Sequence, residues 1–415
     1  MPPRPSLLEI FLVALRLGCT SFGGPVAHLA YFRKEYVEKR GWLDEAHFAD
    51  LVALCQFLPG PASSQTGFGI GYLQRGLAGG LAAALGFTLP SALLMIGFAY
   101  GVGALGRLET AGWLRGLKVA AVAVVAQAVW LMSRNLCPDW PRRALAVAAA
   151  ATVLWLPFAW SQMLVIAVGA AAGWMWFRVG PPLVGGPPPV PGTATSAGPA
   201  TGMYCLILFF ALLLGLPFLA HATANPWLEI FDRFYRVGAM VFGGGHVILP
   251  LLEREVVATG WLTHAQFLAG YGAAQAVPGP LFTLSGYLGA VMAHGPLFSI
   301  SAILHGPLAG LNVPFLVGLW ALLAIFLPAL LLVAAVLPFW QKLRHQSGAQ
   351  AALRGANAAV VGVLLAAFYH PVWTSGITGG RSLGLAVAAL LALLSGKIPV
   401  WAVVLASAAA GAWWL

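Results

Sequence analysis

Charged side chains are scarce in this chain. Asp, Glu, Lys and Arg make up only 8% of its 415 residues, whereas hydrophobic residues make up 60%. Soluble domains carry roughly 25% charged residues, so this composition cannot cover the surface of a soluble fold of such length. Lipid can cover it instead, and apolar stretches that approach the ~20 residues of a membrane-spanning helix recur along the chain. We therefore predict an all-α, polytopic (multi-pass) membrane protein.

Several chemical signatures are also missing. The four cysteines are scattered without metal-ligand spacing or a disulfide framework, and no cluster of His, Asp and Glu suggests a metal site. The sequence contains no phosphate-binding loop of the G-x-x-x-x-G-K-[ST] type and no stretch that reads as a nucleic-acid surface. We therefore expect no cofactor, no metal and no nucleic-acid partner. Transport, if it is the function, would run on an ion gradient or on the membrane potential.

Acidic residues are missing from the last part of the chain. None follows Glu255, and the whole chain carries a net charge of +10. A positively biased interior suits an anionic substrate, although basic cytoplasmic loops explain the same excess.

One pattern, broken by glycine and proline, occurs twice. Each copy combines a Phe-Gly-Gly segment, a Gly-Trp-Leu segment and a segment that begins with Gln and ends with Pro-Gly-Pro. The copies are separated by 219 or 220 positions and occupy residues 22–25, 41–43 and 56–61, and residues 242–246, 260–262 and 275–280. Duplicated breaks inside apolar sequence are typical of secondary transporters built from two repeats.

The repeat divides the chain into two homologous halves, 1–179 and 203–415, of about six hydrophobic segments each. Residues 180–202 are rich in Pro and Gly and carry no charge, which predicts a linker. The second half contains an insertion near His305–Pro314, which we interpret as a loop. The basic segment Arg33–Arg40 matches a second-half segment with one Arg and two Glu. This difference in loop charge favours an inverted orientation of the two repeats, and the glycine and proline motifs predict broken or re-entrant helices.

Two arginines at matching positions are candidates for substrate binding. Arg16 and Arg236 each lie six residues before the motif Phe, among apolar neighbours. A charge in such a place is costly unless it is used, and a guanidinium presents paired donors that fit a tetrahedral oxyanion. The alternatives are that each arginine extends to the membrane interface, or pairs with Glu9 or Glu229 seven residues earlier.

The Pro-Gly-Pro breaks form the other part of the predicted site. Broken helices expose free N–H groups and positive dipole ends, which can hold an oxyanion inside a membrane. A Gln precedes each break, and hydroxyl groups follow at Ser63, Ser64, Thr66, Thr283 and Ser285. The alternative is a kink without a ligand. The candidate substrate-binding residues are Arg16, Phe22, Gly23, Gly24, Gln56, Pro59, Gly60, Pro61 and Ser63, and in the second half Arg236, Phe242, Gly243, Gly244, Gln275, Pro278, Gly279 and Pro280.

Proton coupling requires a titratable group near the transport path. Glu35 and Glu255 occupy matching positions in the two halves, and His246 follows the second glycine cluster. All three are candidates. The competing interpretations are solvated carboxylates in a charged loop and a hydrogen-bonded packing histidine.

In combination, these motifs resemble the chromate ion transporter family. The resemblance rests on S-F-G-G-P-V-A-H-L, G-W-L followed by Asp or Thr, and Q-x-x-P-G-P. Both halves carry the pattern, as in the long, two-domain form of the family. The resemblance implies export of chromate from the bacterial cytoplasm across the inner membrane, driven by the proton-motive force. The second half departs from it at Gly245-His246, which replace Pro25-Val26, so the halves need not do equal work.

The cargo stays open at this point. Sulfate has the charge and tetrahedral shape of chromate, so a carrier of sulfate, or of a lipid phosphate, is the main alternative. A membrane-embedded enzyme that uses His246 and the carboxylates is disfavoured, because such enzymes carry a dense polar cluster and this chain has isolated polar positions. A homodimer is one arrangement open to the protein.

Overall fold

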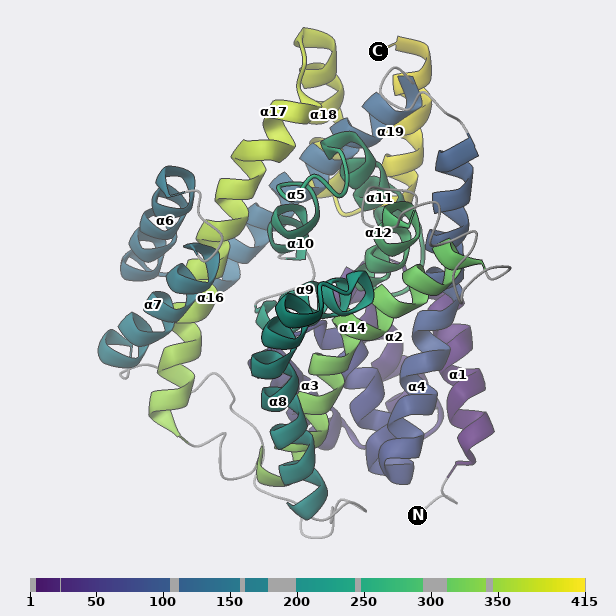
Figure 1. The fold of residues 1–415 in the computed structure, drawn as a ribbon, viewed down its shortest axis with the longest axis vertical. Coiled ribbons are helices and arrows are strands. Elements are labelled where there is room, and N and C mark those ends of the chain that lie inside the picture. Colours follow the sequence, from purple (N-terminus) through teal and green to yellow (C-terminus); the bar gives the residue numbers. More distant parts are fainter. Residues whose placement is uncertain are drawn as a thin grey trace.

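The protein is built from helices alone in the part of the chain that the structure describes (Figure 1). The structure is a computed structural model and describes residues 5–22, 24–104, 112–156, 161–177, 199–242, 248–293, 312–340 and 346–414. Within these ranges, five helices are long and apolar enough to cross a membrane, and four shorter apolar helices accompany them. The prediction of an all-α, polytopic membrane protein is confirmed.

The first half begins at the lower end of the molecule in Figure 1 and runs from α1 to α7. Its longest helix, α4, is interrupted at Arg75 and Gly76, where Gly76 has a φ of 61°. It is therefore two helices joined at a kink. The elements are α1 (Leu7–Thr20), α2 (Gly24–Phe32), the π-helix η1 (Arg33–Lys39), α3 (Glu45–Phe57), α4 (Ala62–Ala104), α5 (Gly112–Leu136), α6 (Trp140–Trp155) and α7 (Ser161–Trp176).

The second half repeats this order after one additional helix, α8. Helices α9 to α11 occupy the positions that match α1 to α3, and α12 with α14 corresponds to the two parts of α4. The elements are α8 (Pro199–Thr223), α9 (Pro226–Met240), α10 (Ile248–Val256), α11 (His264–Ala276), η4 (Leu281–Thr283), α12 (Leu284–Met292), α14 (Val313–Val336), η5 (Leu337–Phe339), α16 (Ser347–Ala367), η6 (Phe368–Trp373), α17 (Thr374–Gly376), α18 (Gly380–Leu394) and α19 (Val400–Trp414).

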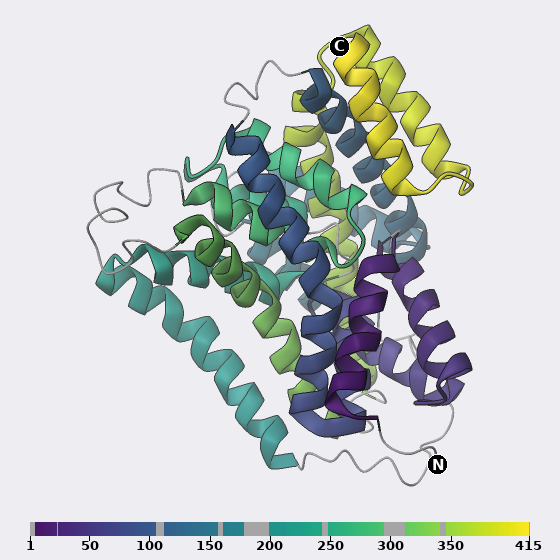
Figure 2. The same ribbon diagram turned by 90° about the vertical axis from the view of Figure 1, so that its right-hand side faces the viewer.

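Helix α8 corrects the predicted end of the linker. Residues 178–198 lie outside the described residues, but the last four residues of the predicted linker form the start of α8. Pro199 is compatible with this first turn, because the N–H that proline lacks would have no helical partner there. The helix runs along the outside of the molecule (Figure 2, teal), and Tyr204 and Phe218 are more than two thirds exposed. In a membrane these side chains contact lipid.

The predicted insertion is only partly visible. Most of it lies outside the described residues, which resume at Asn312. The last two residues of the predicted loop, Val313 and Pro314, already belong to α14, whose first turn is capped by the side chain of Asn312. This part of the prediction is wrong, for the same reason as at α8: Pro is compatible with a first helical turn.

The two halves are interlocked. Helix α5 of the first half packs on α18 and α19 of the second, and α16 of the second packs on α6 and α7 of the first. Both crossings depend on glycine. A Cβ atom at Gly116 would lie 2.0 Å from the carbonyl oxygen of Ser407, and one at Gly355 would lie 2.0 Å from that of Gly169. Only glycine permits such close approach of two helix backbones.

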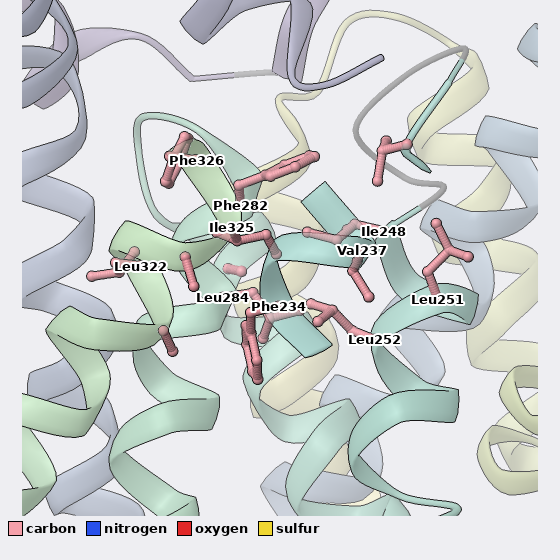
Figure 3. Packing of buried hydrophobic residues seen from close by; sticks show 14 of the residues in the cluster. Phe234, Val237, Ile248, Leu251, Leu252, Phe282, Leu284, Leu322, Ile325 and Phe326 are labelled. Atoms are coloured by element: carbon pink, nitrogen blue, oxygen red, sulfur yellow. The ribbon is translucent and has the colours of Figure 1, made fainter. Parts of the chain in front are cut away.

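The apolar core continues around the second Pro-Gly-Pro break. Figure 3 shows side chains from four elements meeting there: Phe234 on α9, Leu252 on α10, Phe282 on η4, and Ile325 and Phe326 on α14. Phe234, Leu252, Phe282 and Ile325 have no exposed surface. Close packing of this kind leaves little room for adjustment, so the backbone at the break is held in place.

Candidate substrate site at the two helix breaks

Each Pro-Gly-Pro break is hydrogen-bonded to the other half of the chain. The amide of Gly60 donates to the carbonyl oxygen of Val241 at 2.6 Å, and the amide of Gly279 donates to that of Ser21 at 2.9 Å. Ser21 and Val241 are themselves matching residues, at the ends of α1 and α9. The two bonds are therefore equivalent contacts in the two halves, and they bring both breaks and the ends of α1 and α9 into one region.

Glycine is required at the centre of both breaks. Gly60 has a φ of 127° and Gly279 a φ of 98°, in the region that other residues rarely adopt. A Cβ at Gly60 would lie 2.6 Å from the Cβ of Ala329 on α14, and one at Gly279 would lie 2.7 Å from the Oγ of Ser91 on α4. Each break thus rests directly on the long helix of the opposite half.

His28 connects the two breaks, although it is not among the site residues predicted from the sequence. It is 2% exposed, its Nδ1 lies 3.2 Å from the Oγ of Ser63, and its ring also bonds the Ser21 carbonyl. Burial lowers the pKa of His28 to about 4, against a smaller opposing effect of the Ser21 bond. The neutral ring has one donor nitrogen, which serves Ser21, so Nδ1 accepts the hydroxyl proton of Ser63. A histidine inside the S-F-G-G-P-V-A-H-L segment was the available signal.

Two buried hydroxyls at the breaks have no described partner, those of Ser21 and Ser64. The side chain of Gln275 lies against the hydroxyl of Tyr271. The remaining hydroxyls are engaged: Ser63 with His28, and Thr66, Thr283 and Ser285 with backbone carbonyls of their own turns. A buried donor without a partner is costly, so the hydroxyls of Ser21 and Ser64 favour a ligand that accepts hydrogen bonds. Ser64 is thus a better candidate than the predicted Ser63.

The two arginines do not occupy equivalent environments. Arg16 is exposed and lines a shallow surface pocket with Glu9 and Arg40. Arg236 is largely buried and pairs with Asp232 at 2.8 Å. The alternative pairing with Glu9 or Glu229 is wrong, because those carboxylates bind Arg40 and Arg233 instead. The residue of α1 that matches Asp232 is Leu12. Arg236 therefore has a carboxylate on its own helix at this position, and Arg16 does not.

Other predicted residues are placed as follows. Gln56 is exposed, whereas the matching Gln275 is half-buried, so these two do not share an environment. The ring of Phe22 packs 6.0 Å from that of Trp401 on α19, another contact between the halves. Residue 23 and residues 243–247 lie outside the described residues, and these include the predicted Gly23, Gly243, Gly244 and His246.

A carboxylate–arginine–tryptophan cluster recurs in both halves. In the first, Arg40 bridges Glu9 at 2.7 Å and Glu35 at 2.8 Å and lies 5.4 Å from the ring of Trp42. In the second, the bridging arginine is Arg233 on α9. Arg233 binds Glu229 at 3.0 Å and Glu255 at 2.9 Å, and it lies 4.7 Å from the ring of Trp261. These three residues match Glu9, Glu35 and Trp42 of the first half.

This cluster corrects the expectation of solvated carboxylates. The side chains of Glu35 and Glu255 are each only 12% exposed. Burial alone would raise the pKa of Glu35, but hydrogen bonds and charges from Arg40 and Lys39 outweigh it and lower that pKa. Glu35 therefore stays ionised at neutral pH and is a poor proton carrier.

These observations define a class: a multi-pass helical membrane protein whose two interlocked halves meet at a pair of broken helices. The sequence model of the family described as "Chromate transporter" matches residues 8–174 and 228–412, within both halves. The chain belongs to the chromate transporter family.

Named relatives cover most of the chain. It is 27% identical to the "Chromate transport protein" of Pseudomonas aeruginosa, over 100% of this chain and 94% of the relative. It is 26% identical to the "Probable chromate transport protein" of Synechococcus elongatus, over 88% of this chain and 84% of the relative. An uncharacterised transporter of Methanocaldococcus jannaschii is 25% identical over 88% of this chain and 84% of its own length. No solved structure matches the chain.

Proposed function

We propose that this protein transports chromate across the membrane and binds it where the two Pro-Gly-Pro breaks meet. The observation that carries the proposal is the reciprocal pair of hydrogen bonds, from Gly60 to Val241 and from Gly279 to Ser21. It joins the broken helices of both family-matched halves at one place. The choice of chromate as the cargo is supported by the names of two relatives, "Chromate transport protein" and "Probable chromate transport protein".

The chemistry of the breaks suits a tetrahedral dianion. Helix α4 begins directly after the first break, so its unpaired amides and its positive dipole end face the break. Ser21 and Ser64 add hydroxyl donors without other described partners. Since all these groups are neutral, they bind an anion without fixing it as firmly as a buried arginine would. That suits a carrier, which must also release its cargo.

We further propose that transport is export across the bacterial inner membrane, driven by the proton-motive force. Support comes from the sequence, which has no nucleotide-binding loop, and from the resemblance stated above. Sulfate offers the same charge and shape to the same donors, so it is expected to compete with chromate.

Uptake of labelled chromate into inside-out vesicles that contain the protein tests this function. We expect accumulation above protein-free vesicles when a proton gradient is imposed, loss of accumulation when the gradient is collapsed, and inhibition by excess sulfate. Uptake of sulfate without any uptake of chromate would contradict the proposed cargo. Chromate uptake that is the same with and without the proton gradient would contradict the proposed coupling to the proton-motive force.

A further inference from the structure

Each half contains the same side-chain contact, but the acidic and basic partners have exchanged places between the halves. In the first half, Arg33 on η1 binds Glu45 at the start of α3, with Nε and Oε1 2.7 Å apart. In the second half, Glu253 on α10 binds His264 at the start of α11, with Oε1 and Nδ1 3.3 Å apart. Glu253 lies 220 positions after Arg33, and His264 lies 219 positions after Glu45. The contact is therefore the same in both repeats, with acid and base exchanged.

The second-half pair differs from the first-half pair in burial and in the chemistry of its base. Arg33 and Glu45 are about half exposed, at 49% and 59%. The side chain of Glu253 is 16% exposed and that of His264 is 46% exposed. A histidine and a buried carboxylate are the groups whose titration falls closest to pH 7.

No arginine neutralises Glu253 in the described part of the chain. The guanidinium of its neighbour Arg254 turns to α7, where it donates to the Oγ of Ser161. The arginines of α9, which packs on α10, bind other carboxylates: Glu229, Asp232 and Glu255. The further charged or titratable groups that influence the pair are Lys118 on α5 and His370 on η6, which act on His264.

These surroundings set the titration of the pair. Burial raises the pKa of Glu253 to about 7, and the charge of Arg254 opposes this only in part. Burial, together with His370 and Lys118, lowers the pKa of His264. Near pH 7 the pair therefore gains or loses one negative charge as Glu253 titrates, while the lowered pKa of His264 favours a neutral imidazole. The two groups share a single proton, so the titration belongs to the pair.

We propose that Glu253 and His264 form the proton-binding site that couples this transporter to the proton gradient. The proposal rests on the proposed proton-driven function and assigns a site to it. The step is a simple exchange: the Glu253 carboxylate takes a proton from one side and becomes a carboxylic acid that donates to His264, then loses the proton to the other side.

The position of the pair links protonation to the cargo site. Glu253 lies on the helix that follows the second Phe-Gly-Gly segment, and His264 is the first residue of α11, which ends two residues before Pro278. The negative charge of Glu253 is attracted to the positive N-terminal end of α11. Protonation removes this attraction and so changes the force on the helix that carries the second break.

Infrared titration of the purified full-length protein tests the proton site without any transport. We expect wild type to show one carboxyl group that titrates near pH 7, and Glu253→Gln to lack it. Glu45→Gln, which removes the carboxylate of the equivalent pair in the first half, should retain it. If the carboxyl signal persists in Glu253→Gln, the assignment is overturned. Should Glu253→Gln fail to reach the membrane, Glu253→Asp serves instead: we expect a shifted midpoint, and an unchanged midpoint overturns the assignment.

Vesicle assays then test coupling. Glu253→Gln should exchange chromate across the membrane without a gradient at a rate near that of wild type, but accumulate at least tenfold less when a gradient is imposed. Glu45→Gln should accumulate chromate as wild type does. Gradient-driven accumulation by Glu253→Gln at the wild-type level overturns the coupling role. If wild type itself moves no chromate, the proposed function fails, while the infrared result still decides whether the proton site exists.

Discussion

Gly60→Ala and Gly279→Ala are each expected to reduce chromate transport at least tenfold. Both glycines have φ angles, 127° and 98°, that are strained for alanine, and a Cβ would collide with Ala329 or Ser91. Backbone strain and overpacking each cost about 1–3 kcal/mol, which is enough to displace the break or to shift its hydrogen bond to the opposite half. Because the break positions the proposed donors, displacement removes the cargo site.

Gly97→Ala on α4 is the matched control. No atom lies within 4 Å of the Cβ position at Gly97, so alanine fits there and removes only chain flexibility. Initial rates of chromate uptake, divided by the amount of protein in the membrane, give the comparison. Wild-type rates in both break variants would show that the breaks have no part in transport. A loss in Gly97→Ala as large as in Gly60→Ala would point to a general intolerance of alanine.

Arg40→Gln and Arg233→Gln are expected to destabilise the protein by about 3 kcal/mol each. Each change leaves two carboxylates, one of them 12% exposed, without the cation that bridges them. Lys39 at 3.4 Å from Glu35, and Arg236 at 3.8 Å from Glu255, offset part of the loss. The effect is measured as the temperature at which half of the purified protein in detergent solution has unfolded and aggregated.

Arg33→Gln is the control for these variants. Arg33 also binds two carboxylates, Glu38 and Glu45, but all three side chains are about half exposed. Exposed ion pairs contribute about 0–1 kcal/mol, so little change is expected. Equal destabilisation by Arg33→Gln and Arg40→Gln would contradict the role assigned to burial.

The sequence was sufficient to predict the class of fold and the positions of the breaks. Low charge, repeated apolar stretches and the duplicated Pro-Gly-Pro segments carry that information directly. The sequence could not predict that Gly60 bonds Val241 and that Gly279 bonds Ser21. A repeat shows which residues of the two halves are equivalent, but not whether a residue contacts its own half or the other one. The exchange of α6–α7 and α18–α19 between the halves was hidden for the same reason.

Side-chain environments were harder to predict than positions. Glu35 lies in the charged run R-K-E-Y-V-E-K-R, which reads as a solvated loop, but the segment forms the π-helix η1 and turns Glu35 and Tyr36 inward. Arg16 and Arg236 match in sequence, yet Asp232 neutralises only the second. Aligning the halves matches Arg33 with Glu253 and Glu45 with His264, but neither the pairing of Glu253 with His264 nor its burial follows from the alignment.

Binding of labelled chromate to the purified protein tests the central claim most directly. Wild type should bind chromate, and Ser64→Ala should bind it at least about tenfold more weakly, because a hydrogen bond to a charged group contributes roughly 1.5–3 kcal/mol. Ser285→Ala, whose hydroxyl already donates to the Phe282 carbonyl, should bind like wild type. Equal affinity of wild type and Ser64→Ala would place chromate elsewhere and contradict the account.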